Sequence, residues 1–267
     1  LSLYPVKKGN AAMFNTTIAT QIYAKICFEA TNSQKKIIEN LSEYLSDDDF
    51  SRIFVLNGFA GTGKTTLIAA LVAALKELRI KPVLLAPTGR AAKVLARYCG
   101  EQALTIHKRI YRQRTNADYE SKFSLDFNRE QGAVFIVDEA SMLSDSTGDG
   151  ALFGSGSLLE DLVSYVRSGR GCRLILVGDS AQLPPVGCDF SPALDPATVS
   201  RYGEVVYGLM DEVVRQQMQS GILFNATLVR CMLENRIYEI PKFEMDYPDF
   251  ESVEGGDFME KLQDAFD

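Results

Sequence analysis

The stretch that most constrains how this chain can fold is the glycine-rich octet GFAGTGKT at residues 58–65. It fits the spacing G-x-x-x-x-G-K-[S/T] and lies between the apolar run RIFVLNG and the helix-forming run KTTLIAALVAALKEL. This is the strand–loop–helix setting of a phosphate-binding loop rather than of a plain strand-to-helix turn. Glycines let the backbone wrap around phosphates, so that its N–H groups and the following helix N-terminus face the negative charge. The sequence therefore predicts a nucleoside triphosphate site.

Individual positions of this loop have expected roles. Lys64 should reach the β- and γ-phosphates of ATP, and the Thr65 hydroxyl should ligate Mg²⁺. The residues expected to bind ATP from the loop are Gly58, Gly61, Thr62, Gly63, Lys64, Thr65 and Thr66.

The remainder of the chain repeats the alternation of strand and helix. Apolar runs such as PVLLAPTG, AVFIVDEA and CRLILVGD alternate with helix-forming segments. Strands that are apolar on both faces indicate an α/β fold, with a parallel sheet flanked by helices. We expect an N-terminal extension over residues 1–30, an ATPase domain over 31–200 and a partial second domain over 201–267. Within the ATPase domain, alternating apolar residues predict a small inserted hairpin at about 111–132.

Acidic and amide side chains follow two of the predicted strands. Asp138 and Glu139 end the run VFIVDEA, where the aspartate can hold Mg²⁺ and the glutamate can polarise a water for attack on the γ-phosphate. Gln182 follows the run LILVGD and could sense the γ-phosphate, or it could cap a turn. A second carboxylate favours an ATP hydrolase over a small-molecule kinase.

Composition excludes several other chemistries. The five cysteines are scattered and the single histidine is His107, which argues against a disulfide framework, a zinc site and a Ser-His-Asp triad. The scattered cysteines also fit a reducing cytoplasm, and no apolar run is long enough to span a bilayer, so we expect a soluble protein without membrane contact. The net charge is −7, yet residues 90–114 hold seven basic residues and one acidic residue. That segment could attract nucleic acid.

Four further motifs, in this order, resemble those of superfamily 1 (1B) DNA helicases, most closely the RecD-like branch that includes the exodeoxyribonuclease V alpha subunit. They are APTGRAA at 86–92, TIHK at 105–108, DEASM at 138–142 and GDSAQLPPVG at 178–187. The resemblance covers residues 31 to about 235, the N-terminal portion of such an enzyme. It implies a RecA-like P-loop NTPase fold with ATP and Mg²⁺ as cofactors.

The resemblance also implies roles for single residues. Gln34 resembles the glutamine that reads the adenine edge, although it could be an ordinary exposed helix residue. Thr88, Gly89 and Arg90 match a segment that contacts single-stranded DNA, with a solvated helix face as the alternative. His107 matches a position near the DNA track, but a lone histidine is as often packed structurally, and we assign it no catalytic role.

Two more features are assigned by the same resemblance. Arg215, in VVRQ, resembles an arginine finger that reaches the γ-phosphate across the interdomain cleft; its alternative is a surface salt bridge. The hairpin with Phe123 and Phe127 matches the position of a pin that splits duplex DNA, although packed aromatic residues would look the same. Lys64, Glu139, Gln182 and Arg215 are therefore the expected catalytic set.

The later motifs of a second RecA-like domain do not occur before Asp267, so we expect a truncated chain, with a naturally short ATPase as the alternative. The function expected by resemblance is an ATP-dependent DNA helicase or translocase that moves 5′-to-3′ on single-stranded DNA in recombination or repair. This fragment should hydrolyse ATP weakly and be monomeric. The expected partners are single-stranded DNA and tailed duplex, with room for other exonuclease–helicase subunits. The competing hypotheses are an ATP-switched binding or loading module without unwinding activity and a P-loop GTPase or kinase.

Overall fold

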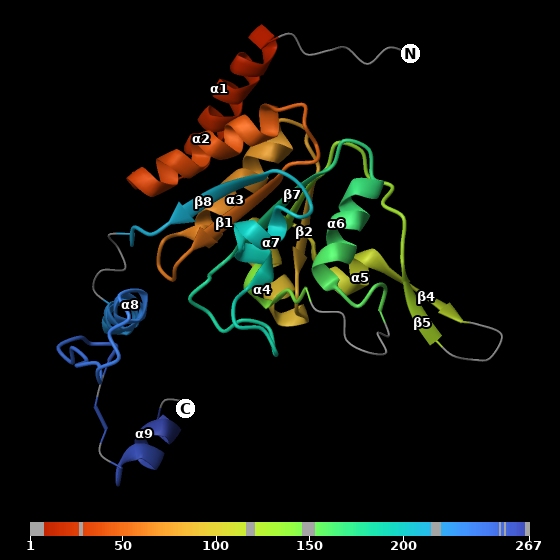
Figure 1. Ribbon diagram of the computed structural model, residues 1–267. Helices are drawn as coiled ribbons and strands as arrows, with labels where there is room; N and C mark the ends of the chain where they lie inside the picture. The colour runs from red at the N-terminus through yellow and green to blue at the C-terminus, as the bar shows by residue number, and fades with distance from the viewer. Residues whose placement is uncertain are drawn as a thin grey trace, which may run out of the picture. The chain divides into compact units, whose positions relative to one another are not determined.

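The structure is a computed structural model that describes residues 8–26, 29–115, 121–145, 153–214, 220–250, 252–253 and 255–264. The chain forms two compact units, Leu1–Glu212 and Val213–Asp267, which we call the first and second units. The first unit holds the phosphate-binding loop and is shown with its labelled strands and helices in Figure 1.

The first unit is built on the expected parallel sheet, which confirms the predicted α/β class. Its six strands lie in the order β3-β2-β6-β7-β1-β8. Their bounds are β1 Ile53–Gly58, β2 Pro82–Ala86, β3 Ala103–Thr105, β6 Val134–Val137, β7 Arg173–Gly178 and β8 Val205–Met210. All six residues of β1 and of β7 are buried, which is why these strands read as continuous apolar runs.

Helices cover both faces of this sheet, and alternate residues of β1 enter two separate cores. Phe54 and Leu56 pack into one core, whereas Ile53 and Val55 pack into the other. The first core lies under α1 (Lys8–Lys25), α2 (Asn32–Ser46), α3 (Lys64–Glu77) and α4 (Gly89–Cys99). The second lies under α5 (Ile106–Ile110), α6 (Leu158–Ser168), α7 (Pro196–Val199) and the 3₁₀ turns η1 (Ala140–Met142) and η2 (Pro192–Leu194).

The N-terminal segment that the sequence assigned to an extension contributes to the first core. Ile18 and Ile22 of α1 are fully buried there. Helix α1 packs on α2 and α3, and Figure 1 shows it beside α2.

The expected boundary near residue 200 is wrong. Residues 205–210 fall within the predicted second domain, but they form β8, which pairs in parallel with β1, from Ile53 opposite Val205 to Gly58 opposite Met210. The division between the two units falls after Glu212. A strand at the sheet edge has the same local pattern as one that opens a new domain, so sequence spacing alone did not separate the two cases.

The predicted hairpin insertion is confirmed. Strands β4 (Tyr111–Thr115) and β5 (Ser121–Leu125) pair antiparallel, with Gln113 opposite Phe123. The hairpin ends at Leu125, earlier than the expected end at about 132, and Phe127 lies beyond it, 64% exposed.

The second unit contains α8 (Gly221–Glu234) and α9 (Phe258–Asp264). Asp249 accepts hydrogen bonds from Ser220 Oγ and the Gly221 backbone N–H, each at 2.6 Å, and so holds the start of α8. The described residues of this unit form no named strand, so its assignment as the start of a second RecA-like domain stays a prediction.

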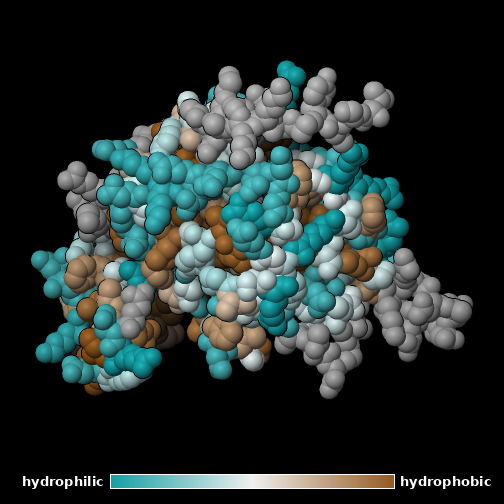
Figure 2. Space-filling model, turned by 45° about the horizontal axis from the view of Figure 1, so that its top comes forward, coloured by the Kyte–Doolittle hydropathy of each residue, from teal (hydrophilic) through white to brown (hydrophobic). Residues whose placement is uncertain are grey.

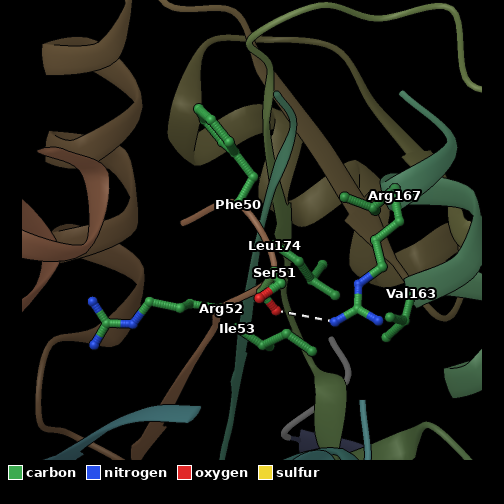
Figure 3. Close-up of a pocket in the computed structure, with 8 residues that line it drawn as sticks. Phe50, Ser51, Arg52, Ile53, Val163, Arg167 and Leu174 are labelled. Atoms are coloured by element: carbon green, nitrogen blue, oxygen red, sulfur yellow. Dashed lines mark hydrogen bonds between the residues drawn. The ribbon is translucent and has the colours of Figure 1, made fainter. Parts of the chain in front are cut away.

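The amino edge of the sheet is closed around a small hollow lined by Ile53, Val163 and Leu174 (Figure 3). Arg167 donates to the backbone carbonyl of Ser51 at 3.0 Å, the contact drawn as a dashed line. The apolar residues that line this hollow come from α6 and from the starts of β1 and β7, so the hollow belongs to the packing between α6 and the sheet.

Among the described residues, no helix is both long enough and apolar enough to span a membrane. Figure 2 shows mainly hydrophilic atoms on the face that it presents, interrupted by smaller hydrophobic areas.

Candidate nucleotide and nucleic-acid site

The phosphate-binding loop joins β1 to α3 and depends on its glycines in two ways. Gly61 and Gly63 have positive φ angles of 77° and 86°, a conformation that costs other residues free energy. At Gly58, an added Cβ would lie 2.8 Å from Lys64 Cγ and 3.1 Å from Met210 Cβ. The loop therefore holds the Lys64 side chain directly against the backbone of the β1 terminus.

Lys64, the first residue of α3, has its ammonium group inside this loop. Its Nζ donates to the carbonyl of Gly58 and, at 3.0 Å, to that of Phe59. The carboxylate of Asp179, which follows β7 and is 4% exposed, lies 3.5 Å from the same Nζ. The positive charge is thus placed between the loop and the end of β7, where phosphate oxygens would meet it.

Thr65 and Asp138 are the candidate magnesium ligands. Burial, together with the nearby charge of Glu139, raises the pKa of Asp138 to about 6, although the Glu139 backbone N–H and Lys64 oppose the shift. Among the described residues, no group of three or more His, Cys, Asp or Glu could form a protein-only metal cage. One carboxylate and one hydroxyl fit Mg²⁺, which usually takes few protein ligands and completes its shell with phosphate and water.

Glu139 has an unusual backbone, with φ at 55° in the left-handed region. This conformation costs a non-glycine residue about 1–3 kcal/mol, and such strain concentrates at functional sites. It lets the chain leave β6 abruptly and enter the turn η1, in which Ala140 and Ser141 are buried. The carboxylate expected to polarise water thus lies at a strained strand end beside Asp138.

Gln182 is joined to the same turn through Ser141, which the sequence did not single out. The Ser141 hydroxyl and Gln182 Oε1 are 3.1 Å apart, and Ser141 is fully buried. Gly178 permits this approach, because a Cβ there would lie 2.9 Å from the Ser141 backbone nitrogen. Gln182 is therefore linked to the strand end that carries Asp138 and Glu139.

A hollow of about 340 Å³ brings together residues from three predicted motifs. Its lining joins the start of α4 to the end of β6 and to Gln182. The lining residues are Thr88, Arg90, Ala91, Val94, Asp138, Glu139, Met142 and Gln182. The candidate hydrolytic acids and the candidate DNA contacts thus line the same hollow.

Gln34 is buried, so the alternative that it is an ordinary exposed helix residue is wrong. It is 1% exposed, and its Nε2 donates to the backbone carbonyl of Thr62 at 2.9 Å. Its Oε1 accepts from the Thr31 N–H at 3.0 Å, which completes the cap of α2. The side chain ties α2 to the phosphate-binding loop, and adenine recognition by Gln34 stays a prediction.

The candidate DNA contacts lie at the start of α4. Thr88 caps this helix, its Oγ1 accepting from the Ala91 N–H at 3.2 Å, and Gly89 is its first residue. Arg90, Lys93 and Arg97 are exposed on α4, and within the described part of the chain no ion pair involves them. Phosphate contact at these positions stays a prediction.

His107 packs at the base of the hairpin rather than in the shared hollow. Its ring centroid lies 5.6 Å from that of Tyr111 and 5.1 Å from that of Phe153. Phe123 stacks on Phe153 at 4.5 Å, and burial lowers the pKa of His107. His107 is therefore packed among aromatic rings, as the structural alternative predicted, and a DNA contact at this residue is untested.

Arg215 lies outside the described residues, so its predicted role as an arginine finger is untested.

The parallel sheet and the phosphate-binding loop together define a P-loop NTPase fold. The sequence model of the AAA domain family matches residues 29–224, and the chain belongs to that family.

Relatives of known name support the RecD-like resemblance. The chain is 30% identical over 154 residues to an ATP-dependent RecD2 DNA helicase from Deinococcus radiodurans, a match covering 58% of this chain and 19% of that protein. It is 33% identical over 201 residues to the RecBCD enzyme subunit RecD of Mycobacterium tuberculosis, covering 61% and 32%. The chain therefore spans less than a third of the length of these curated relatives.

A solved structure gives the same fold. A Pif1 helicase from Bacteroides, in complex with ADP-AlF3 and ssDNA, matches with a TM-score of 0.50 and 17% identity, covering 89% of this chain and 57% of that one.

Proposed function

We propose that this chain is the ATP-hydrolysing part of a DNA helicase or translocase that acts on single-stranded DNA. The proposal is carried by one observation: the candidate DNA contacts and the candidate hydrolytic residues line the same hollow. These residues are Thr88, Arg90, Asp138, Glu139 and Gln182. A strand held at the start of α4 would lie beside the groups that face the γ-phosphate. Hydrolysis and strand binding could then influence each other through side chains that line the same hollow.

The chemical roles follow from where each side chain lies. Lys64 would bind the β- and γ-phosphates, while Thr65 and Asp138 would hold Mg²⁺, which neutralises phosphate charge when bound. Glu139 would accept a hydrogen bond from a water, orienting its oxygen toward the γ-phosphorus. As that oxygen bonds to the γ-phosphorus, one water proton passes to Glu139 and the bond between the phosphorus and the bridging oxygen breaks, so that ADP and phosphate are released. Gln182, linked through Ser141 to the same turn, would report whether the γ-phosphate is present.

DNA binding would begin at the helix N-terminus. Thr88 and Gly89 present backbone N–H groups, and Arg90 adds a positive charge without an ion-pair partner among the described residues. Lys93 and Arg97 continue this charge along α4, which suits a polyanion. We also propose 5′-to-3′ movement, completion of the ATP site by Arg215 from the second unit, and a role in recombination or repair. These extend the likeness to RecD-type helicases.

Further aspects of the proposal concern the setting of the protein. Four free cysteines among the described residues suit a reducing compartment, and we propose the cytoplasm. Partners would be single-stranded or tailed duplex DNA, with other exonuclease–helicase subunits as a further class and a monomer in isolation.

The test uses Glu139→Gln, which keeps the shape of the side chain and removes its charge. We expect Mg-ATP to bind this variant about as tightly as the wild type, while turnover falls by roughly 100-fold or more, the range of a lost general base. Turnover equal to wild type would contradict the role of Glu139.

Strand displacement on duplexes with 5′ or 3′ tails tests the direction of movement. It should be run on a chain that contains two complete RecA-like domains. Preference for the 3′ tail would reverse the proposed polarity. ATP turnover that is slow and independent of DNA in that chain would favour the ATP-switched module instead.

A further inference from the structure

One buried side chain, Asn57, links three neighbouring strands of the sheet, β7, β1 and β8. It is the residue before Gly58 in β1 and is 5% exposed. Its Oδ1 accepts from the Ser180 backbone N–H at 3.0 Å, and its Nδ2 donates to Ser180 Oγ at 2.8 Å and to Tyr207 Oη at 3.0 Å. Both donor hydrogens of the carboxamide are thereby used, which holds the group in one orientation.

The Ser180 contacts place a segment that faces the phosphate-binding loop. Asp179, just before Ser180, has its carboxylate 3.5 Å from Lys64 Nζ, and Gln182, two residues later, contacts Ser141. The Asp179 side chain also accepts from the Ala181 N–H at 2.9 Å, which makes the segment a tight turn. Because Asn57 belongs to the strand that leads into the loop, it fixes this turn relative to the loop.

The Tyr207 contact extends the same connection to β8. The tyrosine ring is 39% exposed, and its hydroxyl reaches inward to Asn57. The next residue, Gly208, lies against α2, since a Cβ there would be 2.2 Å from Ile37 Cδ1. A single amide therefore ties the turn after β7, the loop strand β1 and the edge strand β8.

We propose that Asn57 is a positioning residue for γ-phosphate recognition. It sets the spacing between the phosphate-binding loop and the Asp179–Gln182 turn, so that ATP is distinguished from ADP only while the turn is held in place. The inference rests on the proposed function, since it assumes that the loop binds ATP. Diphosphate binding depends on the loop itself and should not require Asn57.

A second buried asparagine provides a matched control. Asn128 is 1% exposed and precedes β6, at the amino edge of the sheet. Its Nδ2 donates to the Val166 carbonyl at 3.2 Å, and its Oδ1 accepts from the Glu130 N–H at 3.0 Å. Replacing either asparagine removes buried side-chain hydrogen bonds, but only Asn57 contacts the turn that faces Lys64.

The experiment compares Asn57→Ala and Asn128→Ala with the wild type. For each protein, the melting temperature and the dissociation constants of Mg-ADP and of a non-hydrolysable Mg-ATP analogue are measured, the latter by displacement of a fluorescent nucleotide. We expect Asn57→Ala to weaken the analogue by about five- to thirtyfold, the effect of losing one or two hydrogen bonds, while ADP stays within about twofold. Asn128→Ala should lower the melting temperature but leave both affinities unchanged. Tyr207→Phe, which keeps the Ser180 contacts, should show a smaller loss than Asn57→Ala.

The contrary outcomes separate the two levels of the argument. If Asn57→Ala weakens the binding of ADP and of the analogue equally, or changes the binding of neither, then Asn57 is a stabilising residue like Asn128 and the positioning role is wrong. A wild type that binds the two nucleotides equally would also overturn it. A wild type that binds neither nucleotide, or a Lys64→Ala variant that binds both normally, would instead contradict the proposed function.

Discussion

Replacing Asp138 by asparagine is expected to stabilise the first unit while it abolishes ATP hydrolysis. The folded pKa of about 6 lies above the ordinary aspartate value of 3.8, chiefly because the carboxyl group is buried. At about 1.4 kcal/mol per pH unit, keeping this group ionised at pH 8 costs the folded state about 3 kcal/mol. Asparagine removes the charge and can still accept from the Glu139 N–H. Because its own amide must also be desolvated, we expect a net gain of about 1–3 kcal/mol.

The sign of the pH dependence makes this prediction specific. A carboxyl group with a raised folded pKa favours the native state below its unfolded pKa, and that contribution is lost as the pH rises through about 6. The stability advantage of Asp138→Asn should therefore be full at pH 8, roughly halved at pH 5 and reduced to about a fifth at pH 4.

Urea unfolding of both proteins at these pH values, without Mg²⁺ or nucleotide, measures the difference directly. Asp48→Asn, at an exposed position of the same unit, should change stability little at any pH. Adding Mg-ATP analogue should reverse the order, because only the wild type retains the ligand carboxylate. If Asp138→Asn is no more stable than the wild type at pH 8, the proposed desolvation of Asp138 is wrong.

Other substitutions test the loop, the packing of β8 and the hairpin base. Lys64→Ala should abolish nucleotide turnover and leave the far-ultraviolet circular dichroism spectrum unchanged; retained turnover would rule out the phosphate-binding loop. Gly208→Ala should destabilise the first unit by about 1–3 kcal/mol in urea unfolding, because its Cβ would overlap Ile37, and an unchanged midpoint would contradict the packing of α2 on β8. Tyr111→Phe should cost about 1–2 kcal/mol, because the hydroxyl donates to Asp161 at 2.7 Å, and hydrogen exchange of the hairpin amides should quicken; unchanged exchange would show that this contact does not hold the hairpin.

The features predictable from sequence were those that local chemistry fixes. The phosphate-binding loop needs its glycines and Lys64 at set positions, and Asp138 and Glu139 directly end an apolar strand, so a short window contains the whole signal. Buried parallel strands are also distinctive, which is why the α/β class emerged without any tertiary information.

The features that could not be predicted from the sequence depend on contacts between distant segments. Ser141 and Asn57 each act through partners more than 40 residues away, and a single polar residue in an apolar strand was the one local sign of Asn57. Gln34 could be read as exposed because its partner, the Thr62 carbonyl, lies beyond the next strand. The edge strand β8 was misplaced for the same reason, since its pairing with β1 spans about 150 residues of chain.

The most direct test of the central account measures whether nucleotide and DNA binding are coupled. Fluorescence anisotropy would give the affinity of this chain for single-stranded DNA without nucleotide, with Mg-ADP and with a Mg-ATP analogue, using Lys64→Ala as the uncoupled control. Because the two candidate sites share the hollow between α4 and the end of β6, we predict that the analogue changes DNA affinity by at least about fivefold, the lower range of known site-to-site coupling. The same DNA affinity in all three nucleotide states would contradict the account.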